Sequence, residues 1–138
     1  MRWIGAMSLA LVLGACSDDT SFSPTVENVA GDYSASLFTL SLPVGPVNQL
    51  VLGSEVTASL APDGTMTGRF FVPHGGADGA DLDADLTGTW TLSRGAVTFD
   101  PAVDTFIREM RFRVDRNRLA GTDTFGHQTL DLVLTKTE

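Results

Sequence analysis

Apolar and polar residues alternate along most of the chain from residue 29 onward, as they do in strands that bury one face. The clearest run is DLDADLTGTWTL, residues 81–92, in which aspartates and threonines alternate with leucines, Ala84, Gly88 and Trp90. A helix, at about 3.6 residues per turn, would scatter these apolar residues around its circumference. Similar alternation recurs over residues 56–60, 66–72, 110–114 and 130–134. The pattern therefore predicts a protein built of strands.

Turn-forming residues separate these runs at the spacing of hairpins. They are Pro62-Asp63-Gly64, Arg94-Gly95, Arg116-Asn117 and Gly126-His127, which tolerate positive φ or preset a turn. We predict eight strands, over residues 32–42, 54–61, 65–72, 82–93, 96–100, 106–114, 118–125 and 128–136. Short antiparallel connections favour an up-and-down meander, and closure into a barrel removes its exposed edges. The predicted fold is an all-β, eight-stranded antiparallel up-and-down barrel, with an open β-sandwich as the alternative.

The N-terminal segment MRWIGAMSLALVLGAC has a different character from the rest. Arg2 precedes an apolar run, residues 3–13, that has the length of a secretory signal and is too short to span a membrane. Leu13-Gly14-Ala15-Cys16 resembles the lipobox of bacterial lipoproteins. The resemblance implies that residues 1–15 are a cleaved signal peptide and that Cys16 is acylated. An ordinary secretory signal and an uncleaved N-terminal anchor are the alternatives.

The same resemblance implies an exported protein held to the membrane by its lipidated cysteine. Residues 16–28 are polar and contain a proline, which predicts a flexible tether ahead of a domain at residues 29–138. In that family, Asp directly after the cysteine favours inner-membrane retention. Ser17 stands there in this chain, so the expected location is the outer membrane, facing the periplasm or the surface. Cys16 is the chain's one cysteine, which excludes an internal disulfide.

Two Gly-x-aromatic motifs carry a second resemblance. Gly31-Asp32-Tyr33 opens the first predicted strand, and Gly88-Thr89-Trp90 lies within LTGTWTLSRGAVTF, residues 86–99. Over residues 29–137 the chain resembles the lipocalin-like, or calycin-type, small barrels and the short bacterial lipoproteins described as lipocalin-like. The resemblance implies a barrel whose interior holds a small molecule.

The bulky residues of the alternating strands are the candidates for such an interior. They are Phe70, Trp90, Phe99, Met110, Phe112 and Phe125. If the barrel is hollow, these side chains line a pocket for a small apolar or amphipathic ligand. If they fill the barrel, the protein is a non-catalytic structural lipoprotein whose loops, especially residues 73–80, contact an envelope protein. The sequence leaves both readings open.

The charge distribution bears on which partners the protein can have. The chain carries 17 acidic and 9 basic residues, a net charge of −8 at pH 7, which argues against nucleic acid as a partner. Five of the basic residues cluster around one predicted hairpin, namely Arg108, Arg111, Arg113, Arg116 and Arg118. An anion site is one interpretation, but we expect them on the outer face, paired with neighbouring acidic strands.

The acidic and histidine side chains do not match the motifs of known metal or catalytic sites. Asp78, Asp81, Asp83 and Asp85 could suggest calcium, but an EF-hand loop starting at Asp81 has leucines where Gly and Glu are required. We expect these aspartates to form the acidic outer face of a strand. His74 and His127 lie in predicted loops, and the chain has no nucleophile elbow, zinc motif or phosphate loop. We expect no catalytic residue, no metal and no cofactor.

Overall fold

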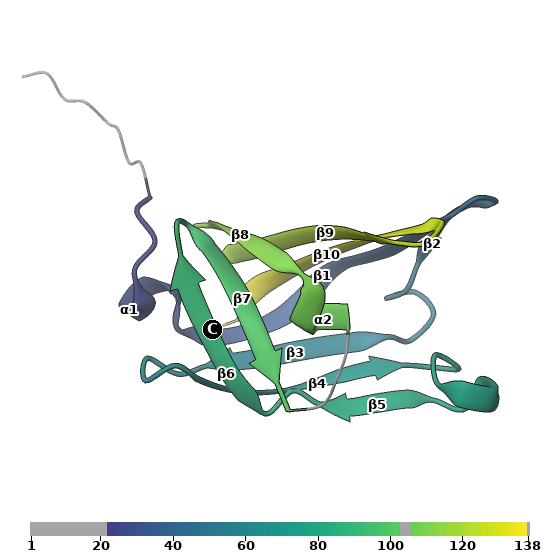
Figure 1. Cartoon of the computed structure of the whole chain (residues 1–138), viewed down its shortest axis with the longest axis horizontal. Coiled ribbons are helices and arrows are strands. Elements are labelled where there is room, and N and C mark those ends of the chain that lie inside the picture. The colour runs from purple at the N-terminus through teal and green to yellow at the C-terminus, as the bar shows by residue number, and fades with distance from the viewer. Residues whose placement is uncertain (1–21, 103–105, 138) are drawn as a thin grey trace, which may run out of the picture.

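The computed structural model describes residues 22–102 and 106–137 of the chain. Eight antiparallel strands form a closed barrel (Figure 1). They are β1 (Gly31–Leu42), β3 (Glu55–Leu60), β4 (Thr65–Val72), β6 (Gly88–Ser93), β7 (Ala96–Pro101), β8 (Arg111–Asp115), β9 (Arg118–Phe125) and β10 (Gln128–Thr137). Each strand pairs with the next around the ring. β10 pairs with β1 from Thr137 opposite Asp32 to Thr129 opposite Ser41, which closes it. The predicted barrel is confirmed, and the open sandwich is excluded.

Two further strands lie outside the ring. β2 (Gly45–Asn48) folds back on the end of β1 and was not predicted. β5 (Leu82–Asp85) pairs only with the far half of β4, whereas β6 pairs with the first residues of β4 and then with β7. The prediction of one continuous strand over residues 82–93 is therefore wrong at residues 86 and 87. The apolar face continues across the break, because Ala84, Leu86 and Trp90 are all buried.

A glycine permits the close approach of strands beside this break. A Cβ on Gly88 would lie 2.2 Å from the carbonyl oxygen of Asp100 on β7, closer than real side chains come to backbone atoms. Glycines at such points allow strands to bend and approach at barrel corners.

The segment before β8 is helical rather than extended. The prediction of a strand over residues 106–114 is wrong for residues 106–109, which form the helical turn α2 (Phe106–Glu109), and the strand begins at Arg111. Ile107 and Met110 are both 1% exposed. Their separation by three residues fits one face of a helical turn and not one face of a strand.

A second helical turn, α1 (Val26–Val29), closes one end of the barrel. Thr25 and Asn28 form a reciprocal capping box at its start, which satisfies backbone donors that the short helix leaves unpaired. Val29 is fully buried, and its carbonyl oxygen accepts a 2.6 Å hydrogen bond from the Tyr33 hydroxyl. Residues 26–28 of the segment expected to be a tether thus belong to α1. The expected signal peptide, Cys16 and residues 17–21 lie outside the described residues.

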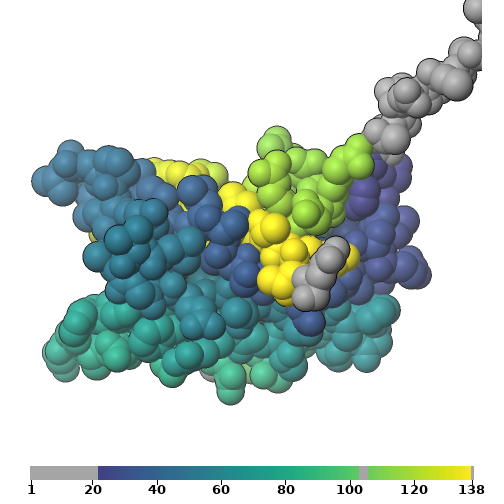
Figure 2. All heavy atoms as spheres, turned by 180° about the vertical axis from the view of Figure 1, so that it is seen from behind, coloured from purple at the N-terminus to yellow at the C-terminus, as the bar shows by residue number. Residues whose placement is uncertain are grey.

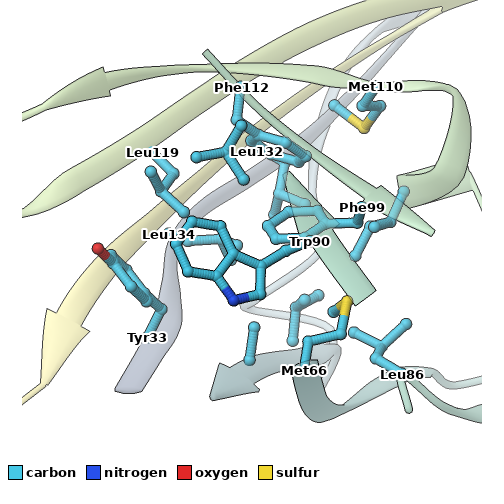
Figure 3. Packing of buried hydrophobic residues seen from close by; sticks show 14 of the residues in the cluster. Tyr33, Met66, Leu86, Trp90, Phe99, Met110, Phe112, Leu119, Leu132 and Leu134 are labelled. Carbon is cyan, nitrogen blue, oxygen red and sulfur yellow. The ribbon is translucent and has the colours of Figure 1, made fainter. Parts of the chain in front are cut away.

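The half of the barrel next to α1 is filled by side chains. Figure 3 shows Trp90 at the centre of this core, with Phe99, Phe112, Leu132 and Leu134 around it. The rings of Phe99 and Phe112 are 5.1 Å apart at their centroids in a tilted arrangement. The indole N–H of Trp90 donates a 2.8 Å hydrogen bond to the carbonyl oxygen of Ala61, in the turn between β3 and β4. Burial and interdigitation of this kind are the main source of stability in a chain without a disulfide.

Candidate functional site

An apolar pocket of about 370 Å³ occupies the end of the barrel opposite α1. Its walls come from β1, β4, β5, β9, β10, α2 and the loops that follow β2 and β4. Seen from behind, the β2 region and the loop of residues 73–81 form two corners of the molecule at this end (Figure 2). The pocket meets solvent beside Leu52 and Phe106, which are 58% and 48% exposed.

Aromatic side chains form much of the wall. Phe38 of β1 and Phe70 of β4 are 4% and 0% exposed, and their ring centroids lie 5.8 Å apart. Phe106 of α2 and Phe125 of β9 form a second pair at 5.1 Å nearer to solvent. The aliphatic part of the lining consists of Leu40, Leu52, Val72, Pro73, Leu82 and Leu130, with Gly75 beside them. Such a lining favours an apolar or aromatic guest.

Three polar residues complete the lining: Gln49, His74 and Gln128. Gln49 is held in place because its N–H donates to the carbonyl oxygen of Phe38 at 2.8 Å and its side-chain oxygen accepts from Ser54 at 3.3 Å. Gln128 opens β10 and is exposed. The pocket is therefore largely apolar with a few polar groups, the composition typical of small-molecule sites.

His74 is an exposed residue of the loop that follows β4, and two hydrogen bonds hold it there. Its φ is 59°, a left-handed value that is uncommon for a residue other than glycine. Its backbone N–H donates to Asp81 at 3.1 Å, and its Nδ1 lies 3.0 Å from the carbonyl oxygen of Gly79, at the end of the 3₁₀ turn η1 (Ala77–Gly79). These contacts hold the ring at the pocket wall.

Only part of the predicted interior lines this pocket. Phe70 and Phe125 do so. Trp90, Phe99, Met110 and Phe112 are 1–5% exposed or fully buried and belong to the filled half of the barrel. The barrel is therefore filled by side chains beside α1 and has an apolar pocket at the other end.

Several lining residues were not foreseen, and β1 shows why. Tyr33 and Ala35 point inward at the start of the strand, but the pairing with β10 shifts between Ala35 and Leu37. The inserted residue changes the phase, so that Phe38 and Leu40 face the interior and Leu37 is 43% exposed. The sequence carries a trace of this shift, because two apolar alternations of opposite phase meet near residue 37.

The aspartate-rich segment forms pairs and loop contacts. Asp83 accepts two hydrogen bonds from Arg69 on β4, from Nε at 2.9 Å and Nη2 at 3.0 Å. This hydrogen bonding lowers the pKa of the Asp83 carboxyl and raises the pKa of Arg69. Within residues 22–102 and 106–137, no group of three or more His, Cys, Asp or Glu side chains is arranged to hold a metal ion.

The arginines of the predicted cluster are spread over the outside. Arg108 contacts Asp100 at 3.6 Å and donates to the carbonyl oxygen of Pro101. Arg118 pairs with Asp115 at 3.2 Å. Arg111, Arg113 and Arg116 are also exposed, with Arg111 3.5 Å from the carbonyl oxygen of Ser93. None of the five lines the pocket.

No helix in the part of the chain that the structure describes is long and apolar enough to cross a membrane. No family model matches the chain, and no curated protein or solved structure matches it either. The pocket itself is therefore the basis for a functional proposal.

Proposed function

We propose that this protein is a non-catalytic, lipid-anchored protein of the bacterial cell envelope whose barrel binds a small apolar or amphipathic molecule. The observation that carries the binding proposal is the apolar pocket of about 370 Å³. Small-molecule sites usually measure roughly 300–1,000 Å³ and are lined by hydrophobic and aromatic side chains with a few polar groups. The pocket lies at the lower end of this range, which favours a compact ligand.

The contrast between the two halves of the barrel supports a binding role. Protein interiors are close-packed, and voids larger than a water molecule are few. The half around Trp90 follows that rule, whereas the half around Phe38 and Phe70 keeps a hollow that apolar side chains of moderate size could have filled. A ligand covering these rings would remove apolar surface from water.

A matched pair of tryptophan substitutions tests the binding proposal. Leu82 of β5 lines the pocket, while Leu92 of β6 is similarly half-buried but lies elsewhere. The probe is N-phenyl-1-naphthylamine, an uncharged dye that fluoresces in apolar surroundings. We expect saturable fluorescence with the unmodified protein and with Leu92→Trp, and at least about tenfold weaker binding to Leu82→Trp because the new ring occupies the pocket. Absence of saturable binding to the unmodified protein, or equal binding to both variants, would refute the proposal.

The anchoring proposal rests on the lipobox-like segment that ends at Cys16. An anchor at Cys16 would hold the chain on the side of α1, at the end of the barrel away from the pocket. The proposed location is the outer membrane, and two or three acyl chains would give stable attachment. We expect Cys16→Ala to move the protein from the detergent phase to the aqueous phase in detergent partitioning. The control Ser17→Ala should stay in the detergent phase, and unchanged partitioning of Cys16→Ala would contradict the proposal.

A second candidate function is a structural lipoprotein that docks an envelope protein. The observation that favours it is the segment 33–54, which carries no charged residue in an otherwise acidic chain. At its far end Val44, Val51 and Leu52 are 92%, 79% and 58% exposed. The paired substitution Val44→Asp with Val51→Asp would abolish recovery of a cross-linked envelope partner if docking is the function. Dye binding in the pocket should survive the same change.

A further inference from the structure

Two of the three polar residues that line the pocket lie on loops, and the third, Gln128, opens β10. Gln49 and His74 come from the two loops that follow β2 and β4. These loops meet, because a Cβ on Gly53 would lie 3.5 Å from Cγ of Pro73. The rings of Phe38 and Phe70 lie on the strands, where they are buried. A guest in the pocket therefore meets an apolar floor and a polar group at the loops.

The hydrogen bond of His74 fixes what its ring can offer a guest. The carbonyl oxygen of Gly79 only accepts hydrogen bonds, so the His74 Nδ1 at 3.0 Å must carry a proton. In the neutral imidazole, Nε2 is then an acceptor without a proton. No hydrogen bond to Nε2 occurs from any residue that the structure describes. A guest that reaches this nitrogen must therefore present a hydrogen-bond donor.

The lining gives no support to a negatively charged guest. Its described residues include no Lys or Arg, and the chain as a whole carries −8. Moving a carboxylate from water into an apolar site is costly unless a cation or several donors compensate it. The long-range field of an acidic protein opposes it further.

We infer that the pocket selects a compact, uncharged amphiphile with a hydroxyl or similar donor group. The donor bonds to Nε2 of His74, and the apolar body lies against Phe38 and Phe70. The available volume of about 370 Å³ corresponds to about a dozen water molecules, which suits a single substituted ring or a short chain. This inference rests on the proposed binding function and names its ligand class.

Three matched probes test the inference by displacing N-phenyl-1-naphthylamine at pH 8. They are 4-butylphenol, 4-butylbenzoate and butylbenzene, which share one body and differ in the polar group. We expect 4-butylphenol to displace the dye at a concentration about 3- to 10-fold lower than butylbenzene, the gain typical of one neutral hydrogen bond. We expect 4-butylbenzoate to be the weakest of the three. Displacement by 4-butylbenzoate at an equal or lower concentration than 4-butylphenol would overturn the inference, as would equal displacement by 4-butylphenol and butylbenzene.

The two histidines of the chain provide a matched pair of variants. His74→Asn removes the ring nitrogen at a position whose positive φ asparagine tolerates. It should abolish the preference for 4-butylphenol over butylbenzene. His127→Asn changes an exposed turn residue outside the pocket and should preserve the preference. A preference unchanged in His74→Asn would overturn the assignment to His74.

The three probes on the unmodified protein remain decisive even if a variant folds poorly. Failure of the dye itself to bind would refute the proposed function. Binding of the dye with the wrong order of the three probes would refute only the ligand class.

Discussion

The Nε1–H of Trp90 donates a 2.8 Å hydrogen bond to the carbonyl oxygen of Ala61, which ties the centre of the core to the turn between β3 and β4. Trp90 is 5% exposed, so the indole contributes both burial and a partly buried polar contact. An apolar core alone would leave that carbonyl without this donor. The hydrogen bond therefore holds the turn after β3, at the α1 end of the barrel, against the core that fills the same half.

Substituting Trp90→Phe tests this coupling. We expect a loss of about 1–3 kcal/mol in the free energy of unfolding, because the carbonyl of Ala61 loses one of its two donors, keeping only the N–H of Gly64 at 3.1 Å, and the core loses volume. Trp90→Ala should cost about 3–5 kcal/mol. Urea unfolding followed by circular dichroism measures both. Thr91→Ala, on the exposed face of the same strand, should change stability by less than about 0.5 kcal/mol. A Trp90→Phe variant as stable as this control would contradict the role given to the hydrogen bond.

Burial raises the pKa of the Tyr33 phenol to about 12. Because the folded state favours the neutral phenol, its contribution to stability is complete below the unfolded pKa of about 10 and is lost as pH rises from there toward 12. Tyr33 is the chain's one tyrosine, so its phenolate absorbance can be followed directly. We expect little ionisation at pH 10.5 in buffer and more than half in urea. Equal titration in both conditions would show that the ring is not buried.

The ion pair between Arg69 and Asp83 should make the free energy of unfolding depend slightly on pH in the acidic range. Hydrogen bonds from Arg69 lower the pKa of Asp83, so the stabilisation is present above the unfolded pKa of about 4 and is lost as pH falls through the folded pKa. Asp83→Asn should therefore flatten the decline in unfolding free energy between pH 5 and pH 2. Asp85→Asn is the control, since no side-chain hydrogen bond or ion pair joins Asp85 to the residues described, although its backbone lies opposite Arg69 in the sheet. Both residues of the pair are exposed, so the effect should be modest.

Close strand packing predicts that Gly88 cannot carry a side chain. A Cβ there would lie 2.2 Å from the oxygen of Asp100 and 2.7 Å from Cα of Pro101, and both are backbone atoms. Gly88→Ala should therefore force β6 and β7 apart and cost about 1–3 kcal/mol or more. Thermal unfolding of Gly88→Ala beside Thr89→Ala measures the effect. Equal melting temperatures of the two variants would mean that the strands separate at no cost.

The barrel could be predicted from the sequence because period-2 alternation and turn residues are local signals. Breaks in the period-2 alternation could not be predicted in this way, because they depend on pairing with distant strands. The phase change between Ala35 and Leu37 depends on an inserted residue whose position is set by pairing with β10, a strand far away in the sequence. Residues 106–109, which form α2, do not show the alternation of apolar and polar residues typical of a strand. Phe112 and Val114 of β8 do show it, and the predicted strand therefore begins too early.

The pocket could not be predicted from short stretches of the sequence, because it too depends on segments that are distant in the chain. Its lining combines strands, a helical turn and two loops, and no run of neighbouring residues encodes it. Size and hydrophobicity identified Phe70 and Phe125 but could not separate them from Trp90 and Phe112, which fill the other half. The sequence places His74 in a loop, and only the fold places it beside an apolar cavity.

Chemical-shift mapping of the protein titrated with 4-butylphenol tests the central claim most directly. We predict saturable shifts of the amide and side-chain resonances of Phe38, Phe70, Val72 and Leu130, which line the pocket. The resonances of Phe112 and Leu119, in the filled half, should stay unchanged. Saturable shifts confined to Val44 and Val51, or no saturable shift at any residue, would contradict a binding pocket at the open end of this barrel.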